Sequence, residues 1–471
     1  MIKKTKIVAT IGPVTTSVEM LSKLLRAGMN VVRLNFSHGD FAEHQEKVNN
    51  FKIAMKETGI GGAILQDLSG PKIRLGEFST ERVELVAGKN ITITTKKIIG
   101  SEKIVSINYL PFPKEVKKGD KIMVDDGKKK FEVLNVKGDE VLCKILIGGD
   151  TKGRRGVNLP DSDLSIKSLT EKDKKDIEFG IKNNVDFFAF SFVRTPEDVK
   201  ELRSILNKKK SKAKIIAKIE TPQAVNNIDA ILELCDGLMV ARGDLAIEVP
   251  AEKVPMIQKM LIKKCNDAGK IVITATQMLE SMIKSPVPTR AEVSDIANAI
   301  LDGTDAVMLS EETTLGSYPV EAVKMMSKVA YDIEHNYPER KVIPVVGRGE
   351  RCVTDSVTGS VVKIAHDLDA KIIIALTKTG YTARMISRHK PESPIIAVTS
   401  DVITSHQLNL SFGCLPVLID SYKEIPEAFK NVREYCLKNK IVNKGDKVVI
   451  VACSSTEKKD NSANSITVET V

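Results

Sequence analysis

Residues 214–242 decide the fold, because they hold two similar apolar runs, KIIAKIE (214–220) and GLMVAR (237–242), with a polar turn and a helical pattern between them. Both runs are nearly continuous in Val, Ile, Leu and Ala, which is typical of parallel strands covered on both faces. Each run also ends in charged side chains, which packing alone does not require.

Runs of this kind occur eight times, and they span 6–11, 30–36, 62–68, 185–192, 214–220, 237–242, 271–277 and 305–310. Segments with helical spacing lie between them, such as 17–27 and 251–268, and Gly28 and Gly269 follow these two at positions typical of helix C-caps. Eight strand–helix units predict an α/β fold, the (β/α)8 or TIM barrel, whose function gathers at the C-terminal ends of the strands.

Two segments depart from this rhythm. Residues 71–168 read as alternating strands with Gly-Asp and Asp-Gly turns, which predicts an all-β insertion at the C-terminal rim of the barrel. After about residue 345, five further runs predict a separate C-terminal α/β domain. We therefore expect a barrel domain formed by 1–70 and 169–345, an inserted β-rich domain at 71–168, and a third domain at 346–471.

Composition narrows the class of protein. The 471 residues are 42% hydrophobic and 28% charged, as in a globular protein, and no apolar stretch is long enough to span a bilayer. The N-terminus lacks the apolar core of a signal peptide, and seven scattered Cys residues without a C-x-x-C motif favour a reduced, cytoplasmic protein. We expect no membrane partner.

The net charge of +10 is unevenly distributed, since residues 71–168 carry 20 Lys and Arg against 14 Asp and Glu. A basic surface is typical of proteins that bind nucleic acid, a membrane or a small anion. Trp is absent and aromatic residues make up only 4% of the chain, which disfavours a protein that stacks nucleic-acid bases. We expect a small anionic substrate and no nucleic-acid partner.

The strand ends carry reactive side chains. Glu220 and Asp244 follow neighbouring strands, so together they offer two carboxylates to a hard divalent cation such as Mg²⁺. Lys218 lies two residues before Glu220 and therefore faces the same side, where an ammonium beside a metal stabilises an enolate or a transferring phosphoryl group. Arg33, Arg74 and Arg242 offer planar guanidinium groups, each of which can donate two parallel hydrogen bonds to a phosphate or carboxylate. Salt bridges within the rim are the structural alternative for all of these groups.

Several segments resemble the signatures of the pyruvate kinase family: 4–13, 28–40, 156–160, 215–225, 239–250, 273–310 and 318–323. The resemblance covers essentially the whole chain and implies a barrel, a β-rich lid and a C-terminal α/β domain. It also implies phosphoryl transfer from phosphoenolpyruvate to ADP, giving pyruvate and ATP in the last step of glycolysis. The implied cofactor is Mg²⁺ or Mn²⁺, and the implied assembly is a homotetramer.

The resemblance assigns roles by motif. The phosphoenolpyruvate positions are Arg33, Lys218, Gly243, Asp244, Thr276 and Ser310, of which Lys218, Arg33 and Thr276 are catalytic. The nucleotide positions are Asn35, His38, Arg74 and Arg155. The Mg²⁺ ligands are Glu220 and Asp244, and the monovalent-cation positions are Asn35, Ser37, Asp67 and Leu68.

Three departures from the family pattern matter. Lys72 stands where K⁺-dependent members have Glu, so its ammonium replaces the charge of K⁺ and predicts activity without K⁺. Glu311 stands where the family has Gly, and the sequence gives it no role. The effector loop of the family, which binds a sugar phosphate and activates the enzyme, is similar to Thr377, Lys378, Thr379, Gly380 and Thr382, but 454–460 lacks the Gly-rich sequence that closes over a bisphosphate.

Two other functions remain as alternatives. A Mg²⁺-dependent aldolase or lyase acting on phosphoenolpyruvate or pyruvate shares a metal-bound enolate but needs no lid. A non-enzymatic protein that binds nucleic acid would use the basic surface. The insertion at 71–168 argues against the first, and the scarcity of aromatic residues argues against the second.

Overall fold

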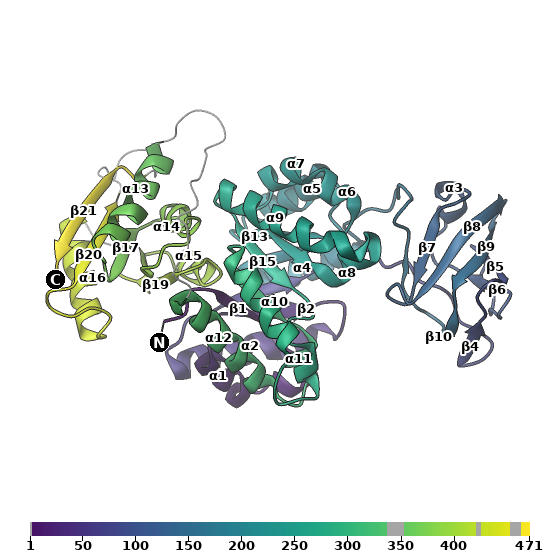
Figure 1. The fold of residues 1–471 in the computed structure, drawn as a ribbon, viewed down its shortest axis with the longest axis horizontal. Helices are drawn as coiled ribbons and strands as arrows, with labels where there is room; N and C mark the ends of the chain where they lie inside the picture. Colours follow the sequence, from purple (N-terminus) through teal and green to yellow (C-terminus); the bar gives the residue numbers. More distant parts are fainter. Residues whose placement is uncertain (1, 337–352, 421–424, 453–462) are drawn as a thin grey trace.

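Three bodies follow one another along the molecule in the computed structural model, which describes residues 2–336, 353–420, 425–452 and 463–471. The barrel lies in the middle, with the β-rich body at one end and the C-terminal body at the other (Figure 1). The predicted junction between residues 345 and 346 lies outside the described residues.

The central body is a closed barrel of eight parallel strands in the order β1-β16-β15-β14-β13-β12-β3-β2. Its strands are β1 (Lys6–Thr10), β2 (Val31–Asn35), β3 (Ala63–Asp67), β12 (Phe187–Phe190), β13 (Lys214–Ile219), β14 (Gly237–Ala241), β15 (Ile271–Ala275) and β16 (Ala306–Leu309). Each lies within one of the eight predicted runs, so the predicted (β/α)8 barrel is confirmed.

Helices surround the barrel. The main ones are α1 (Val18–Ala27), α2 (Phe41–Thr58), α4 (Glu171–Asn183), α5 (Pro196–Lys208), α7 (Ile228–Leu234), α9 (Val254–Ala268), α10 (Arg290–Leu301) and α12 (Pro319–Asn336). Shorter ones are α6 (Pro222–Asn226), α8 (Arg242–Glu248) and α11 (Glu311–Thr314). Gly28 and Gly269 end α1 and α9 with φ of 113° and 64°, a left-handed conformation that costs glycine little.

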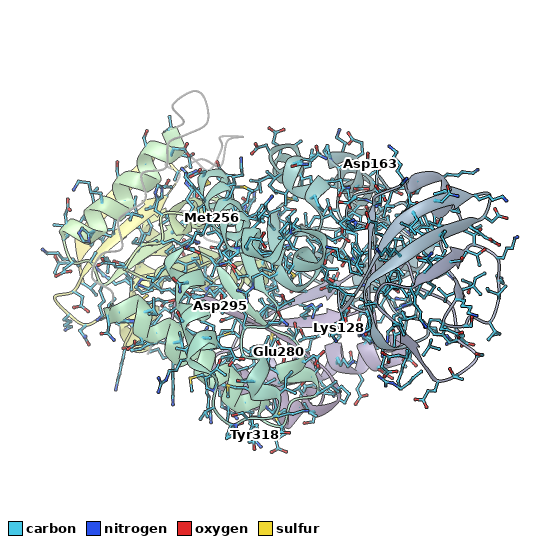
Figure 2. The ribbon with its side chains drawn as sticks, turned by 45° about the vertical axis from the view of Figure 1, so that its right-hand side comes forward. Lys128, Asp163, Met256, Glu280, Asp295 and Tyr318 are labelled. Carbon is cyan, nitrogen blue, oxygen red and sulfur yellow. The ribbon has the colours of Figure 1, made fainter. Side chains whose placement is uncertain are left out.

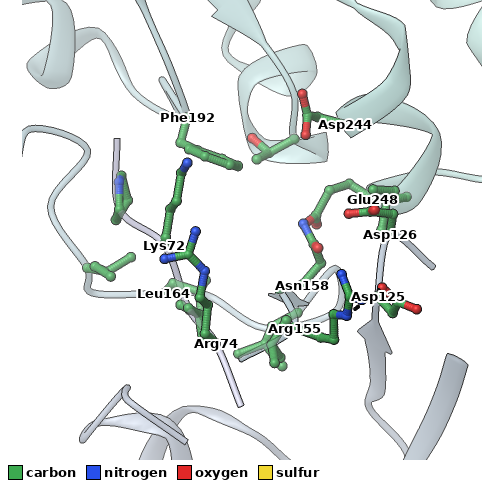
Figure 3. A pocket seen from close by; sticks show the side chains of 18 of the residues that line it. Lys72, Arg74, Asp125, Asp126, Arg155, Asn158, Leu164, Phe192, Asp244 and Glu248 are labelled. Atoms are coloured by element: carbon green, nitrogen blue, oxygen red, sulfur yellow. Dashed lines mark hydrogen bonds and ion pairs between the residues drawn. The ribbon is translucent and has the colours of Figure 1, made fainter. Parts of the chain in front are cut away.

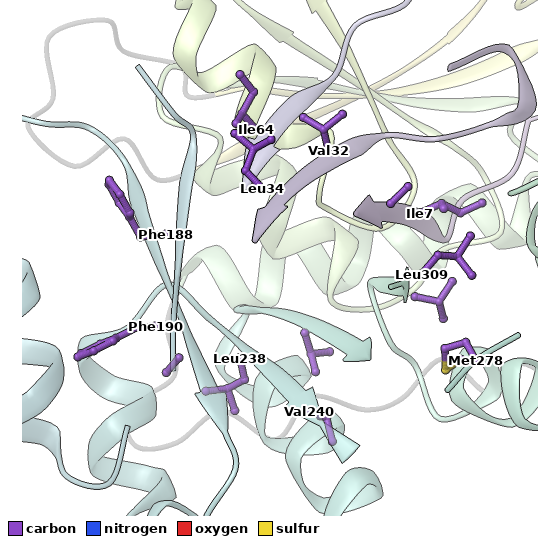
Figure 4. Packing of buried hydrophobic residues seen from close by; sticks show 14 of the residues in the cluster. Ile7, Val32, Leu34, Ile64, Phe188, Phe190, Leu238, Val240, Met278 and Leu309 are labelled. Atoms are coloured by element: carbon purple, nitrogen blue, oxygen red, sulfur yellow. The ribbon is translucent and has the colours of Figure 1, made fainter. Parts of the chain in front are cut away.

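Alternation along β13 explains why a lysine faces the barrel interior. Ile215, Ala217 and Ile219 belong to the apolar layer between the strands and the helices, part of which is drawn in Figure 4. Ile216 points the other way and packs in the separate cluster inside the barrel. Because side chains alternate along a strand, Lys218 faces the same side as Ile216 but one step nearer the C-terminal rim.

The β-rich body contains a six-stranded sheet in the order β11-β7-β8-β9-β5-β6 and a two-stranded sheet, β10-β4. The strands are β4 (Arg82–Leu85), β5 (Asn90–Thr94), β6 (Ile104–Ser106), β7 (Lys121–Val124), β8 (Lys129–Lys137), β9 (Glu140–Ile147), β10 (Gly149–Lys152) and β11 (Val157–Asn158), with one helical turn, α3 (Phe112–Glu115). The chain enters this body after β3 and returns before α4, so it lies beyond the C-terminal ends of the barrel strands. Figure 2 shows Lys128, in the β7–β8 turn, on the side of this body that is nearer the barrel.

The C-terminal body is a sheet in the order β19-β18-β17-β20-β21, parallel except for β21. Its elements are α13 (Val353–Asp367), β17 (Ile372–Leu376), α14 (Tyr381–Ser387), β18 (Ile395–Thr399), α15 (Val402–Leu408), β19 (Cys414–Leu418), α16 (Ile425–Lys438), β20 (Lys447–Ala452) and β21 (Ser465–Thr470). Each strand lies within or overlaps one of the five predicted runs, which confirms the C-terminal α/β fold.

Buried charges join this body to the N-terminal end of the barrel. Lys390 Nζ lies 2.6 Å from Asp305 Oδ1, just before β16, and Lys6 Nζ donates to the carbonyl of Cys414 at 2.5 Å. The lid and the C-terminal body therefore occupy opposite ends of the barrel. None of the helices in the described part of the chain is long and apolar enough to cross a membrane.

A further contact between the C-terminal body and the barrel predicts that the stability of the protein depends on pH. His406 of α15 lies 3.6 Å from Asp186, and its hydrogen bond to that carboxylate raises the pKa of His406. The positive charge of Lys52 opposes this rise. Since the folded state binds the proton more tightly than an unfolded chain, with a pKa of ~6.5, the stabilisation is complete below that pH and is lost as the pH rises through the folded pKa.

We therefore expect His406→Asn to lower the melting temperature more at pH 6 than at pH 9, measured by thermal unfolding of both proteins. His335→Asn, at an exposed position of α12, is the matched control and should show no such trend. An equal effect of His406→Asn at both pH values contradicts the prediction.

Candidate active site

A cavity of about 620 Å³ lies between the C-terminal rim of the barrel and the lid. Barrel residues such as Asp244 and Phe192 line one wall, and lid residues such as Arg155 and Asn158 line the other (Figure 3). The cavity is therefore in the place where barrels of this type carry their active sites.

A buried ion pair joins two neighbouring strands at the base of the site. Arg33, in β2, donates from Nε to Asp67 Oδ2 at 2.7 Å and from a terminal nitrogen to Thr10 Oγ1 at 2.8 Å. The guanidinium is thus fixed on its inner side by β1 and β3. Its remaining N–H groups stay available to an anion.

Lys218 is at the centre of a second set of buried contacts. Its ammonium lies 2.7 Å from Ser191 Oγ, 2.9 Å from Glu220 Oε1 and 3.3 Å from Asp67 Oδ1. Glu220 also accepts a hydrogen bond from the backbone N–H of Phe192 at 2.6 Å. The side chains predicted at the ends of β2, β3 and β13 therefore form one network with Ser191, which follows β12.

Charges in this network shift the pKa values of its members in opposite directions. Burial alone would raise the pKa of Asp67, but Lys218 and Arg33 hold that pKa below its ordinary value. Burial would likewise lower the pKa of Lys218, but Asp67, Glu220 and Asp244 raise it. Glu220 differs, because burial and the nearby charge of Asp244 raise its pKa above the ordinary range.

Glu220 and Asp244 fit a hard divalent cation. Glu220 is only 1% exposed, and burial, with the charge of Asp244 adding to it, raises its pKa against the opposing charge of Lys218. Carboxylate oxygens are suitable ligands for Mg²⁺, which usually takes only one or two carboxylates and completes its shell with water and substrate oxygens. No group of three or more His, Cys, Asp or Glu side chains in the described ranges is arranged to hold a metal ion.

The turn after β15 brings Thr276 to Gly243. Thr276 has φ of 70° and Gln277 of 55°, a left-handed conformation that is rare for a β-branched residue such as Thr276. Thr276 Oγ1 accepts a hydrogen bond from the backbone N–H of Gly243 at 2.8 Å. Arg242 holds this turn, since its guanidinium donates to the carbonyls of Ala275 and Thr276. Arg242 is therefore bound to the protein itself, whereas Arg74 faces the cavity.

One side of the cavity is cationic. Lys72 and Arg74 extend into the cavity side by side in Figure 3, and His38 also lines it. Burial and then the charges of Arg74, Lys218 and Lys172 lower the pKa of Lys72, and burial followed by Lys72 and Arg74 lowers that of His38. Arg155, on the lid, lies 3.3 Å from Asp125. This side of the cavity is suited to an anionic ligand.

Most of the remaining predicted residues make contacts within the protein. Asn35 Oδ1 accepts the backbone N–H of Ser37 at 3.0 Å. The side chain of Leu68 is buried in the core, and its backbone carbonyl accepts a hydrogen bond from the hydroxyl of Ser191. Ser310 donates its backbone N–H to Glu312 at 2.7 Å. Glu311, by contrast, lines the cavity.

The predicted effector residues lie far from this cavity, in the turn between β17 and α14. Lys378 and Thr379 are exposed, whereas Thr377 and Thr382 are buried. Gly380 has φ of 76°, and Arg384 donates to the carbonyl of Thr379 at 3.2 Å. The loop at 454–460 lies outside the described residues.

Sequence reasoning missed four residues of this region. Thr10 and Ser191 are each the last residue but one of a predicted strand run, so the strand-end rule applied to those runs would have found both. Asn158 and Glu248 form a hydrogen bond of 2.7 Å between lid and barrel. They are 90 positions apart in sequence, and no local pattern relates them.

The fold and the cavity define a barrel enzyme with a lid and an anion-binding site. The family model "Pyruvate kinase, barrel domain" matches residues 2–323, and "Pyruvate kinase, alpha/beta domain" matches residues 355–469. The chain belongs to the pyruvate kinase family and is a phosphotransferase.

Individual relatives agree. The chain is 45% identical to a pyruvate kinase of Bacillus licheniformis over 96% of this chain and 78% of that protein. It is 43% identical to one of Clostridium perfringens, covering 96% of each. The crystal structure of a pyruvate kinase from Cryptosporidium parvum is similar with a TM-score of 0.94 and 38% identity, covering 99% of this chain and 96% of that one.

The buried network predicts a large loss of stability when its central cation is removed. Lys218→Met leaves Asp67 and Glu220 buried with less compensation, so we expect the free energy of unfolding to fall by ~3–5 kcal/mol. Urea unfolding in a buffer with a metal chelator measures this. Lys259→Met is the control, because it breaks a half-exposed pair with Asp302 and should cost only about 0–1 kcal/mol. Equal effects of the two variants contradict the prediction.

Proposed function

We propose that this enzyme transfers the phosphoryl group of phosphoenolpyruvate to ADP, giving pyruvate and ATP in the last step of glycolysis. Family membership supports the reaction, and one observation of the site carries it to particular residues. Arg33 and Lys218 are held in a buried network with Asp67 and Glu220, and Asp244 lines the cavity at the same end of the barrel.

Each side chain has a role in this proposal. Glu220 and Asp244 hold Mg²⁺ or Mn²⁺, which when bound neutralises charge on phosphoryl and enolate oxygens. Lys218 and Arg33 stabilise the negative charge that develops on the phosphoryl group and the enolate. Gly243, Thr276 and Ser310 contact phosphoenolpyruvate, and Thr276 acts where the enolate carbon takes up its proton. Asn35, His38, Arg74 and Arg155 bind the nucleotide.

The same proposal covers the organisation of the chain. The barrel comprises 1–70 and 169–345, the lid 71–168 and the regulatory domain 346–471. The lid limits the access of water, which competes with ADP as phosphoryl acceptor. We place the enzyme in the cytoplasm as a homotetramer, which the family resemblance supports. The five described cysteines are all free and buried, as in a reduced protein.

A coupled assay with phosphoenolpyruvate, ADP and Mg²⁺ tests the reaction. We expect activity that a chelator abolishes, and a loss of roughly 10²–10³-fold in kcat for Lys218→Met. Full activity of Lys218→Met would contradict the mechanism, whereas an inactive wild-type protein would contradict the function itself. Lys259→Met again serves as the control.

We also propose that the enzyme needs no K⁺, because the ammonium of Lys72 lies on the cationic side of the cavity and contributes charge next to Lys218. Wild-type activity should be unchanged when a bulky organic cation replaces K⁺ at constant ionic strength. Lys72→Gln should lose activity and regain part of it with K⁺. A several-fold loss in the wild type on removing K⁺ contradicts this proposal.

A sugar phosphate is the proposed activator, bound at Thr377, Lys378, Thr379, Gly380 and Thr382. An exposed Lys and hydroxyl group at a strand-to-helix turn suit a phosphate. Assays at low phosphoenolpyruvate with several sugar phosphates should show activation that Lys378→Met reduces. Activation that is identical in the variant excludes this loop.

A further inference from the structure

The helix that carries Asp244 also touches the lid. Asp244 lies in the first turn of α8, and Glu248 is the last residue of the same helix. Glu248 Oε1 accepts a hydrogen bond of 2.7 Å from the side-chain amide of Asn158, which ends lid strand β11. Figure 3 shows the two side chains meeting across the cavity wall.

We propose that Glu248 and Asn158 form a latch that fixes the lid relative to Asp244 and thereby positions the two halves of the active site. The inference rests on the proposed function, because it concerns a lid that covers phosphoryl transfer. Both residues are positioning residues, since they act through the lid and α8.

The barrel side of the latch is rigid. Arg242, the first residue of α8, donates to the carbonyls of Ala275 and Thr276 and pairs with Asp295 at 2.7 Å. The Gly243 N–H is bound to the Thr276 hydroxyl. Because α8 is only seven residues long, a displacement at Glu248 is transmitted to Asp244 through less than two helical turns.

The lid side of the latch is equally well defined. Asn158 is paired with Met123 of β7, whose following turn contains Asp125, Asp126 and Gly127. A β-carbon placed on Gly127 would lie 3.7 Å from Ile247 Cγ2, so this turn packs beside α8. The same corner of the lid therefore lies against α8 at two places, through the hydrogen bond of Asn158 and where the turn at Gly127 approaches Ile247.

The environment of Glu248 makes the loss of this hydrogen bond costly. Burial, with Asp244 adding to it, raises the pKa of Glu248 to about 7, and the amide of Asn158 opposes that rise. A poorly solvated carboxylate that loses its donor is left unsatisfied, which is more costly than losing an exposed contact. The closed arrangement of lid and helix thus depends on this donor.

Loss of the latch should affect ligand retention and water exclusion more than the chemical groups themselves. We expect Glu248→Ala and Asn158→Ala each to raise KM for ADP roughly tenfold, the effect of one hydrogen bond to a charged group. The change in kcat should be smaller. Pyruvate should also form in excess of ATP, because water reaches the phosphoryl group when the lid is loose.

The variants are designed to separate a latch from a general structural role. Glu248→Gln keeps the acceptor oxygen and should restore KM and the one-to-one ratio of pyruvate to ATP. The double variant Glu248→Ala/Asn158→Ala should be no worse than either single one, since both remove the same bond. Glu81→Ala is the matched control, because its side chain is 81% exposed on the lid and pairs with Lys152 away from the barrel.

Steady-state kinetics with phosphoenolpyruvate and ADP, together with separate pyruvate and ATP measurements, decide the matter. Wild-type kinetic constants in both single Ala variants, or additive losses in the double variant, overturn the latch. An inactive wild-type enzyme would instead overturn the proposed function. Circular dichroism identifies any variant that fails to fold. In that case Glu248→Gln and Asn158→Asp replace the Ala variants. Glu248→Gln should have the kinetic constants of the wild type, whereas Asn158→Asp should raise KM for ADP, because two carboxylates then repel each other.

Discussion

The pairing of buried charges at the C-terminal ends of three strands is the constraint on which the site depends. Arg33, Asp67, Lys218 and Glu220 are each no more than 8% exposed. Charges removed from water are costly unless they are paired and hydrogen-bonded. The closed barrel meets this requirement because it brings β2, β3 and β13 together, with Ser191 after β12 bridging Lys218 and Asp67.

The pairing also bears on the proposed function. Asp67 is paired with both Arg33 and Lys218, and Glu220 shares Lys218 with it. The carboxylates of Glu220 and Asp244 are suited to a divalent cation, and the guanidinium of Arg33 and the ammonium of Lys218 are suited to the anion that we propose accompanies it. In the proposed mechanism, stability and function draw on the same side chains, since the network that neutralises the barrel interior also orients Arg33 and Lys218.

The barrel separates the two other bodies and connects them. β16 begins next to Asp305, which is paired with Lys390 of the C-terminal body, and ends next to Ser310 at the active-site rim. At the rim, α8 contacts the lid through Glu248 and the site through Asp244. Short elements therefore link each end of the barrel to its neighbouring body.

The sequence by itself determined the architecture and the charged residues that form the buried network at the strand ends. Continuous apolar runs identified all eight barrel strands, because a parallel sheet buried on both faces must be apolar along its length. The period of two placed Lys218 and Glu220 on one face, and Lys218 Nζ lies 2.9 Å from Glu220. The family motifs then supplied roles that spacing alone did not.

Only the tertiary structure decided which charged groups are partners. The sequence does not distinguish the partners of Arg33, Arg74 and Arg242. In the structure, Arg33 pairs with Asp67, Arg242 donates to the turn after β15 and Arg74 faces the cavity. Likewise, Asn158 and Glu248 meet because the inserted lid folds back over α8. Partner choice depends on closure of the barrel and on the position of the lid, which bring together residues far apart in the chain, whereas strand patterns depend on local burial and can be read from the sequence.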